Sequence, residues 1–325
     1  MLTIYFHPSY GRQKRIFFTR KLRYSKFLTL IEFISWKLKL PLSNNFIYSG
    51  PRKLQNNLLK SFKDNKNVSF NDYKYENSYL LQYDHIYGKK TYNKIIKQFP
   101  NAKVIIGPLY ENKNLIELAN EVKNNKNLKL CIASEWVKNL INDVTLSAVP
   151  SDQIVVLPVG VTKQARDFKV EYSKEKTALV YFKKRDKKEL AELINILEDK
   201  KITYKIFEYG KYMNKNLMEY AKRADFGIVL NKTESQGIAT LELLSVGLPL
   251  IVIDDKYLQF ENHKIESTSI PYWSDLCGLN LESVNNLTTE LEEFLNNLDT
   301  YRPQDYINKT LTFEVMTKKL LNQFK

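Results

Sequence analysis

The sequence predicts an α/β fold in which strands alternate with helices and form parallel sheets. The stretch Thr233–Asp254 reads as a loop, a helix over Ile238–Val246 and a strand over Leu250–Ile253. Gly247 and Pro249 are typical of a helix stop, and an unbroken apolar run is typical of a strand buried on both faces. Strand–helix–strand alternation recurs elsewhere, and 325 residues suffice for two domains of ordinary size.

Composition indicates a folded protein in a reducing compartment. The chain is 43% hydrophobic and 26% charged, which supports a sizeable core and argues against global disorder. Its two cysteines, Cys131 and Cys277, lie in no metal-like spacing and indicate no disulfide framework. The N-terminus lacks an apolar signal-peptide region, and no apolar run approaches the ~18 residues of a spanning helix. We therefore expect a cytoplasmic protein, with peripheral membrane contact as an open alternative.

Positive charge is concentrated at the N-terminus. The net charge is +14, and residues 1–60 hold twelve Lys and Arg against Glu32, so 12 − 1 = +11 lies there. Gly11–Leu40 reads as a basic, partly amphipathic helix, which suits either an anionic membrane surface or packing on its own domain with a solvated basic face. No specific nucleic-acid partner is expected, because the aromatic residues are not interleaved with the charge run as a stacking platform requires.

The first half of the chain predicts one parallel sheet. Its expected elements are a strand over Leu2–Phe6, a helix over Ser49–Phe62 opened by a Gly-Pro turn, and strands over Ser78–Tyr83 and Lys103–Ile106. Catalytic groups in such sheets gather at the carboxyl ends of strands. His85 follows a strand and is a candidate catalytic residue, although a lone histidine is more often structural.

The second half predicts a similar sheet after a polar linker at Thr162–Lys176. The expected elements are strands over Ala178–Phe182, Lys201–Phe207 and Phe226–Leu230, a helix over Asn214–Arg223 and a final helix over Leu311–Phe324. We therefore expect domains at 1–165 and 175–300, with C-terminal helices at 301–325 that are candidates for packing back on the first domain.

Two features of the second half suit a diphosphate. The small-residue turn before Ile238 opens a helix, whose first backbone N–H groups attract anions. Lys183 and Arg185 follow the first strand, where cations would stabilise the charge that a leaving nucleotide gains. The alternative for these two residues is a solvated basic turn.

The sequence resembles a known family at Glu234 and Glu242. Glu-Ser-x-Gly-x-x-x-x-Glu, followed by Gly-x-Pro and an apolar strand, resembles the E-x7-E signature of retaining GT-B glycosyltransferases. Cys131–Ile141 and Ser151–Val161 resemble the passage that closes the first domain of these enzymes. The resemblance covers Ser49–Asp254 and implies an α/β GT-B fold, with two Rossmann-like domains whose parallel sheets face each other across a cleft.

The resemblance also implies a reaction and a site. The expected activity is transfer of a sugar from a nucleotide-diphosphate-sugar donor to a carbohydrate or other hydroxyl acceptor, with retention of configuration. Glu242 would bind the ribose, Glu234 would lie near the donor sugar, and His85 would contact that sugar from the first domain. The remaining donor-binding candidates are Lys183, Arg185, Tyr209, Gly210, Ser235, Gln236, Gly237, Ile238, Gly50 and Arg52.

Missing motifs narrow the alternatives. The sequence contains no G-x-G-x-x-G and no P-loop, which argues against a dinucleotide oxidoreductase and a P-loop kinase or ATPase. No Asp-x-Asp occurs, so we expect no metal site. We expect no cofactor either, since the nucleotide-diphosphate-sugar is the donor substrate. A non-catalytic or nucleic-acid-directed binder on the same scaffold, whose affinity would fall steeply with salt, and a nucleotide-sugar epimerase remain as alternatives.

Overall fold

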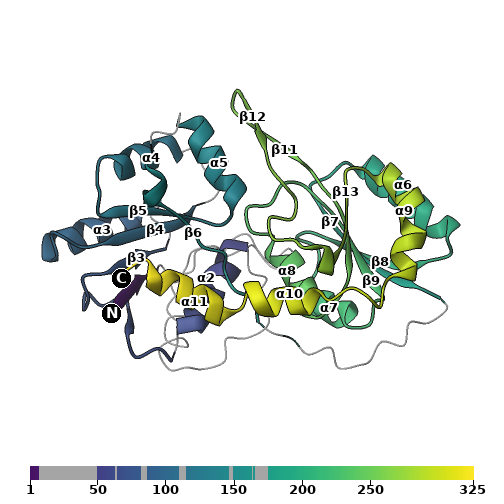
Figure 1. Ribbon diagram of the computed structural model, residues 1–325, viewed down its shortest axis with the longest axis horizontal. Helices are drawn as coiled ribbons and strands as arrows, with labels where there is room; N and C mark the ends of the chain where they lie inside the picture. Colours follow the sequence, from purple (N-terminus) through teal and green to yellow (C-terminus); the bar gives the residue numbers. More distant parts are fainter. Residues whose placement is uncertain are drawn as a thin grey trace, which may run out of the picture. The chain divides into compact units, whose positions relative to one another are not determined.

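The structure is a computed structural model that describes residues 1–6, 50–62, 64–81, 86–109, 115–145, 149–162, 164 and 175–325 (Figure 1). It contains two compact units. Unit 1 comprises Met1–Ile132, Ala148–Leu157 and Thr317–Lys325, and unit 2 comprises Ala133–Ser147 and Pro158–Met316. The helix over Glu135–Val144 thus belongs to unit 2, although it follows a strand of unit 1.

Unit 1 is built on a parallel sheet of six strands in the order β2-β1-β3-β4-β5-β6. The strands are β1 (Leu2–Tyr5), β2 (Val68–Phe70), β3 (Ser78–Leu80), β4 (Val104–Leu109), β5 (Leu128–Ile132) and β6 (Ile154–Val156). Its helices are α2 (Gly50–Phe62), α3 (Ile86–Gln98), α4 (Leu115–Lys123) and the 3-10 turn η2 (Ser151–Gln153). The predicted parallel sheet of the first half is confirmed.

Unit 2 is built on a five-stranded parallel sheet in the order β13-β10-β9-β7-β8. The strands are β7 (Thr177–Lys183), β8 (Thr203–Glu208), β9 (Phe226–Asn231), β10 (Leu250–Ile253) and β13 (Gly278–Leu281). The helices are α5 (Glu135–Val144), α6 (Lys187–Asp199), α7 (Asn214–Ala221), α8 (Ile238–Ser245), α9 (Val284–Asn296) and α10 (Pro303–Thr310). Because β8 and β9 flank β7 on opposite sides, the strand order reverses between β7 and β9.

Helices cover both faces of the unit 2 sheet (Figure 1). Side chains of a strand alternate between faces. Ala178, Val180 and Phe182 of β7 pack in one apolar cluster with α6 and α9. Leu179 and Tyr181 join the other cluster, which contains residues of α7, α8 and α10. The unbroken apolar pattern of these strands therefore reflects burial on both sides.

One pair of strands in unit 2 was not predicted. β11 (Tyr257–Phe260) and β12 (His263–Glu266) form an antiparallel hairpin that extends from the parallel sheet (Figure 1). Ile265 is the single buried residue of β12, which lies against α5. A short strand with so little buried surface carries almost no apolar periodicity, so the sequence gives no clear strand signal.

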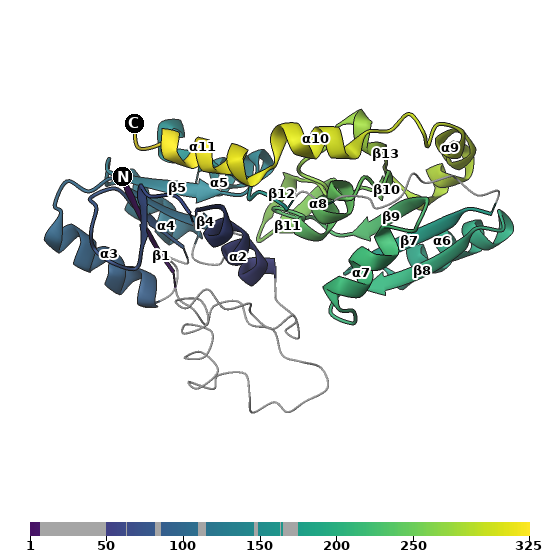
Figure 2. The ribbon, with the colours of Figure 1, turned by 90° about the horizontal axis from the view of Figure 1, so that it is seen from below.

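Element ends differ from the predictions where the backbone leaves regular geometry. The strand predicted from Lys201 begins at Thr203, because Lys201 has φ 55 and closes a turn after α6. The predicted C-terminal helix is α11 (Phe313–Asn322), which follows α10 as a separate helix (Figure 2). Pro303 is the first residue of α10, where its missing N–H costs no hydrogen bond.

We expect Gly278→Ala to destabilise unit 2 by about 2 kcal/mol more than Gly210→Ala does. Gly278 has φ 133, and an added Cβ would lie 2.0 Å from the carbonyl oxygen of Leu250, whose strand pairs with β13. Gly210 also has a positive φ, of 82, but nothing lies within 4 Å of its added Cβ. Urea unfolding of both variants measures the difference, and equal midpoints would show that this close approach is unimportant.

Candidate active site

The candidate site lies at the carboxyl ends of β7 and β9. Lys183 ends β7 and lies beside Asn231, which ends β9, in the parallel register of the two strands. The loop that carries Glu234 follows β9 and leads into α8. In open α/β sheets, ligands bind outside the carboxyl ends of strands where the strand order reverses, and β7 and β9 form that point here.

Lys183 and Glu234 form an ion pair at this point. The Lys183 ammonium contacts the Glu234 carboxylate, and the two side chains are only 17% and 16% exposed. The Lys183 Nζ also lies 4.5 Å from the centre of the Tyr209 ring, in cation–π geometry. The structure therefore brings together three of the predicted site residues, from the ends of three neighbouring strands.

Helix α8 begins next to this ion pair. Gly237 has φ 67 and precedes the helix, and no side chain caps it there. An uncapped helix start presents backbone N–H groups and positive dipole density. Glu242 lies in the second turn of the same helix and is buried, with 8% exposure. An anion bound at Ile238 would thus have a buried carboxylate one turn further along α8.

Two tyrosines that the sequence analysis did not select lie beside these carboxylates. The rings of Tyr181 and Tyr212 meet edge to face, with centroids 6.1 Å apart. Burial raises the pKa of both hydroxyls well above the usual range, and the charges of Glu234 and Glu242 raise the pKa of Tyr212 further. Both hydroxyls are therefore protonated at neutral pH. With 21 tyrosines in the chain, residue type alone does not single out these two.

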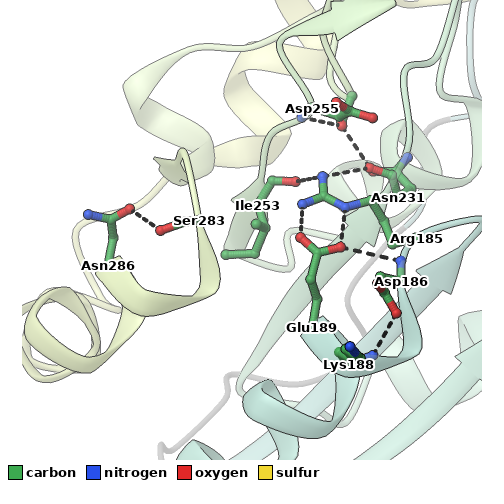
Figure 3. Close-up of polar contacts among 10 residues, drawn as sticks. Arg185, Asp186, Lys188, Glu189, Asn231, Ile253, Asp255, Ser283 and Asn286 are labelled. Carbon is green, nitrogen blue, oxygen red and sulfur yellow. Dashed lines mark hydrogen bonds and ion pairs between the residues drawn. The ribbon is translucent and has the colours of Figure 1, made fainter.

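Hydrogen bonds hold the Arg185 side chain at the carboxyl edge of the unit 2 sheet (Figure 3). Its guanidinium pairs with Glu189, with Nε 2.8 Å from Oε2, and donates to the carbonyl oxygens of Ile253 at 3.3 Å and Asn231 at 3.5 Å. The hydrogen bond to Glu189 raises the pKa of Arg185, and the same bond lowers the pKa of Glu189. Arg185 thus fastens the ends of β9 and β10, and its contact with a diphosphate stays a prediction.

A buried carboxylate orders the loop that faces Glu234. Asp254 accepts hydrogen bonds from the Ser269 N–H at 2.6 Å and from the Thr268 hydroxyl at 3.0 Å. Ser269 in turn donates to the carbonyl oxygen of Asn231 at 2.8 Å. The Thr268 carbonyl oxygen accepts a hydrogen bond from the backbone N–H of Glu234 at 3.0 Å. These hydrogen bonds connect the loop after β12 to the carboxyl ends of β9 and β10 and to Glu234.

The other predicted residues have different placements. Gln236 is buried, and its amide pairs with the backbone of Val159, while Ser235 is half-buried and Gly210 follows β8. Gly50 and Arg52 lie in the first turn of α2 in unit 1, and the structure describes no side chain there. His85 and the basic stretch Gly11–Leu40 lie outside the described residues. The donor-binding roles of these residues and the membrane contact stay predictions.

Other kinds of site receive no support within the described residues. There, no group of three or more His, Cys, Asp or Glu side chains has the arrangement of a metal site. Burial raises the pKa of Cys131 and of Cys277 to about 12, so neither thiol ionises appreciably at neutral pH. Of the helices described, none is long and apolar enough to cross a bilayer.

Comparison with known proteins places the fold. No protein-family model and no curated protein matches the sequence. The chain is similar to the crystal structure of TarM, with a TM-score of 0.52, 15% identity and coverage of 86% of this chain and 59% of TarM. It is also similar to the galactosyltransferase WaaB (TM-score 0.48, 12% identity, 84% and 79% coverage) and to the sucrose-phosphate synthase of Thermosynechococcus elongatus (0.47, 11%, 84% and 78%).

The chain spans a little under three fifths of TarM, so the likeness concerns architecture and not the whole activity of that protein. Both units here are parallel α/β sheets, as the sequence predicted. Together with the likeness to TarM, this arrangement shows that the chain has the GT-B fold.

Proposed function

We propose that the protein is a retaining glycosyltransferase that moves a sugar from a nucleotide-diphosphate-sugar to a glycan or another hydroxyl acceptor. A fold alone does not determine an activity, so the proposal depends on the site. The observation that carries it is the Lys183–Glu234 ion pair beside the uncapped start of α8, at the point where the strand order of unit 2 reverses.

The proposed diphosphate site combines a cation with a helix start. Negative charge grows on the diphosphate as the glycosidic bond breaks, and groups aimed at that charge lower the barrier. The N–H groups at Gly237 and Ile238 supply fixed dipoles, and Lys183 supplies a full charge. In the structure Glu234 contacts Lys183 and neutralises this charge. Donor phosphate would compete for Lys183, and the Glu234 carboxylate would then be released toward the sugar.

Glu242 is the proposed ribose ligand. An ionised carboxylate only accepts hydrogen bonds, so it suits the two adjacent hydroxyls of a ribose. Its position one turn beyond the phosphate site on α8 is consistent with the distance from a diphosphate to its ribose, at ~1.5 Å of rise per residue. Tyr212, whose neutral hydroxyl lies in the field of this carboxylate, would form part of the same pocket.

Retention requires no dedicated base in the reaction that we propose. The acceptor hydroxyl attacks the sugar on the face from which the diphosphate leaves. The leaving phosphate oxygen takes the acceptor's proton, the glycosidic C–O bond breaks and the new C–O bond forms. Glu234 would lie near the donor sugar and contact it from unit 2. This scheme follows the front-face mechanism usually proposed for the enzymes that the sequence resembles.

A thermal-shift screen tests the proposal. Ligand that binds only the folded state stabilises it by RT ln(1 + [L]/Kd), or about 2.7 kcal/mol at a ligand concentration of 100 Kd. We expect at least one member of a panel of UDP-, GDP-, ADP-, CDP- and dTDP-sugars to raise the melting temperature. If no member of the panel does so, while the protein unfolds cooperatively, a nucleotide-sugar site is excluded.

We expect donor turnover to persist in excess EDTA. Lys183 and the start of α8 provide the positive charge that a metal ion supplies in other transferases, and the described residues hold no acidic cluster for such an ion. Rates with and without chelator should agree within about twofold, which is a small change on the scale of one hydrogen bond. Activity that disappears with EDTA and returns with Mn²⁺ would contradict this expectation.

A further inference from the structure

Trp136 of α5 makes a polar contact with the loop that carries Glu234. Its indole Nε1 donates a hydrogen bond to the carbonyl oxygen of Glu234 at 2.9 Å. The side chain is almost fully buried, with 7% exposure. The two residues are 98 positions apart in the sequence but belong to the same unit. Because the indole is largely shielded from water, this bond holds the loop more firmly than a fully exposed bond would.

Both backbone polar groups of Glu234, the N–H and the carbonyl oxygen, therefore form hydrogen bonds. Its carbonyl oxygen accepts from Trp136, and its N–H donates to Thr268 at 3.0 Å. The start of α5 is itself held, because the Tyr272 hydroxyl donates to the carbonyl oxygen of Ala133. The carboxylate of Glu234 meanwhile contacts Lys183. The position of this carboxylate thus depends on a helix from the first half of the chain.

A second pair of hydrogen bonds holds the same loop at Gln236. The backbone N–H of Val159 donates to Gln236 Oε1 at 3.1 Å, and Gln236 Nε2 donates back to the Val159 carbonyl oxygen at 3.4 Å. Trp136 and Val159 lie in the two passages that the sequence resemblance singled out. The two apolar clusters described above do not contain Trp136, and the proposed chemistry assigns it no role.

We propose that Trp136 is a positioning residue, whose indole N–H fixes the backbone at Glu234 so that the Glu234 carboxylate meets the donor sugar. This inference rests on the glycosyltransferase function proposed above. The diphosphate contacts at Lys183 and the start of α8 do not involve the indole. Loss of the N–H should therefore slow sugar transfer while nucleotide binding is retained.

Trp136→Phe tests this inference, because it keeps an aromatic ring and removes only the donor and part of the ring area. With the donor identified by thermal shift, we expect kcat to fall about 10- to 100-fold, since small misplacements of catalytic groups have effects of this size. The KM for the donor should stay within about threefold, and the Kd of the free nucleoside diphosphate within about twofold, because those contacts remain. Trp273→Phe, at a half-buried tryptophan of unit 2, should leave kcat within about twofold of wild type.

A second variant separates the hydrogen bond from packing. Benzothienylalanine at position 136 keeps the bicyclic shape but has sulfur in place of the indole N–H. We expect it to reproduce the loss of kcat with a urea midpoint close to wild type. The inference is overturned if this variant retains the wild-type kcat, or if it weakens nucleoside diphosphate binding as strongly as it lowers kcat. A wild-type protein that neither binds nor consumes any nucleotide-sugar would instead refute the proposed function.

Discussion

Glu242→Ala is expected to weaken donor binding by about 30- to 1,000-fold, measured by titration calorimetry with the nucleotide-sugar that gives the largest thermal shift. The variant loses two charge-assisted hydrogen bonds to the ribose, which together contribute about 2–4 kcal/mol. Folding should suffer less than binding. The carboxylate is buried, so its removal relieves a desolvation cost as well as removing contacts.

Glu292→Ala is the matched control for this substitution. Glu292 is also a helical glutamate of unit 2, but its side chain is 79% exposed in α9. We expect its variant to bind the donor with wild-type affinity and to unfold at a similar urea concentration. Unchanged donor affinity in Glu242→Ala would show that this residue is a buried helix residue with no part in the donor site.

Lys183→Met is expected to lower kcat/KM for the donor about 100- to 1,000-fold, which is the usual effect of removing one group that stabilises developing negative charge. Methionine preserves the apolar stem and removes the ammonium. The variant also leaves Glu234, only 16% exposed, without the cation that it contacts. That carboxylate would then repel the incoming diphosphate.

Lys184→Met controls for the general loss of one positive charge, because Lys184 is the next residue and is exposed. Steady-state rates of this variant should stay within about threefold of wild type, as surface substitutions usually have small effects. If both lysine variants lose the same activity, the effect is one of overall charge, and the specific role of Lys183 would have to be abandoned.

The parts of the site that could be predicted are those that depend on residues close together in the sequence. Strand β10 spans the residues expected from the apolar run, and α8 begins at Ile238 after a glycine, as the small-residue turn indicated. Lys183 was selected from its place after a buried strand, and Glu234 from the resemblance of its motif. Helix stops, apolar runs and strand ends depend on neighbouring residues, so a single sequence contains them.

Contacts between distant segments could not be predicted. The Lys183–Glu234 pair joins residues 51 positions apart, and the Trp136–Glu234 bond joins residues 98 positions apart. The first depends on the register of β7 and β9, which the hydrophobic pattern of fully buried strands does not determine, and the second depends on how α5 packs against the loop after β9. The Arg185–Glu189 pair is different, because its i,i+4 spacing and the Asp186–Glu189 capping box were visible in the sequence. Those signals favour a structural role for Arg185.

Under the proposed function, the sugar leaves the nucleotide-diphosphate donor and keeps its anomeric configuration. ¹H NMR of the first product, recorded before the released or transferred sugar can equilibrate between anomers, tests it most directly. With an α-linked donor we predict an α-linked product or α-anomer, formed as the nucleoside diphosphate appears and formed far more slowly with Lys183→Met. A β-configured first product, or no consumption of any donor that binds, would contradict the account.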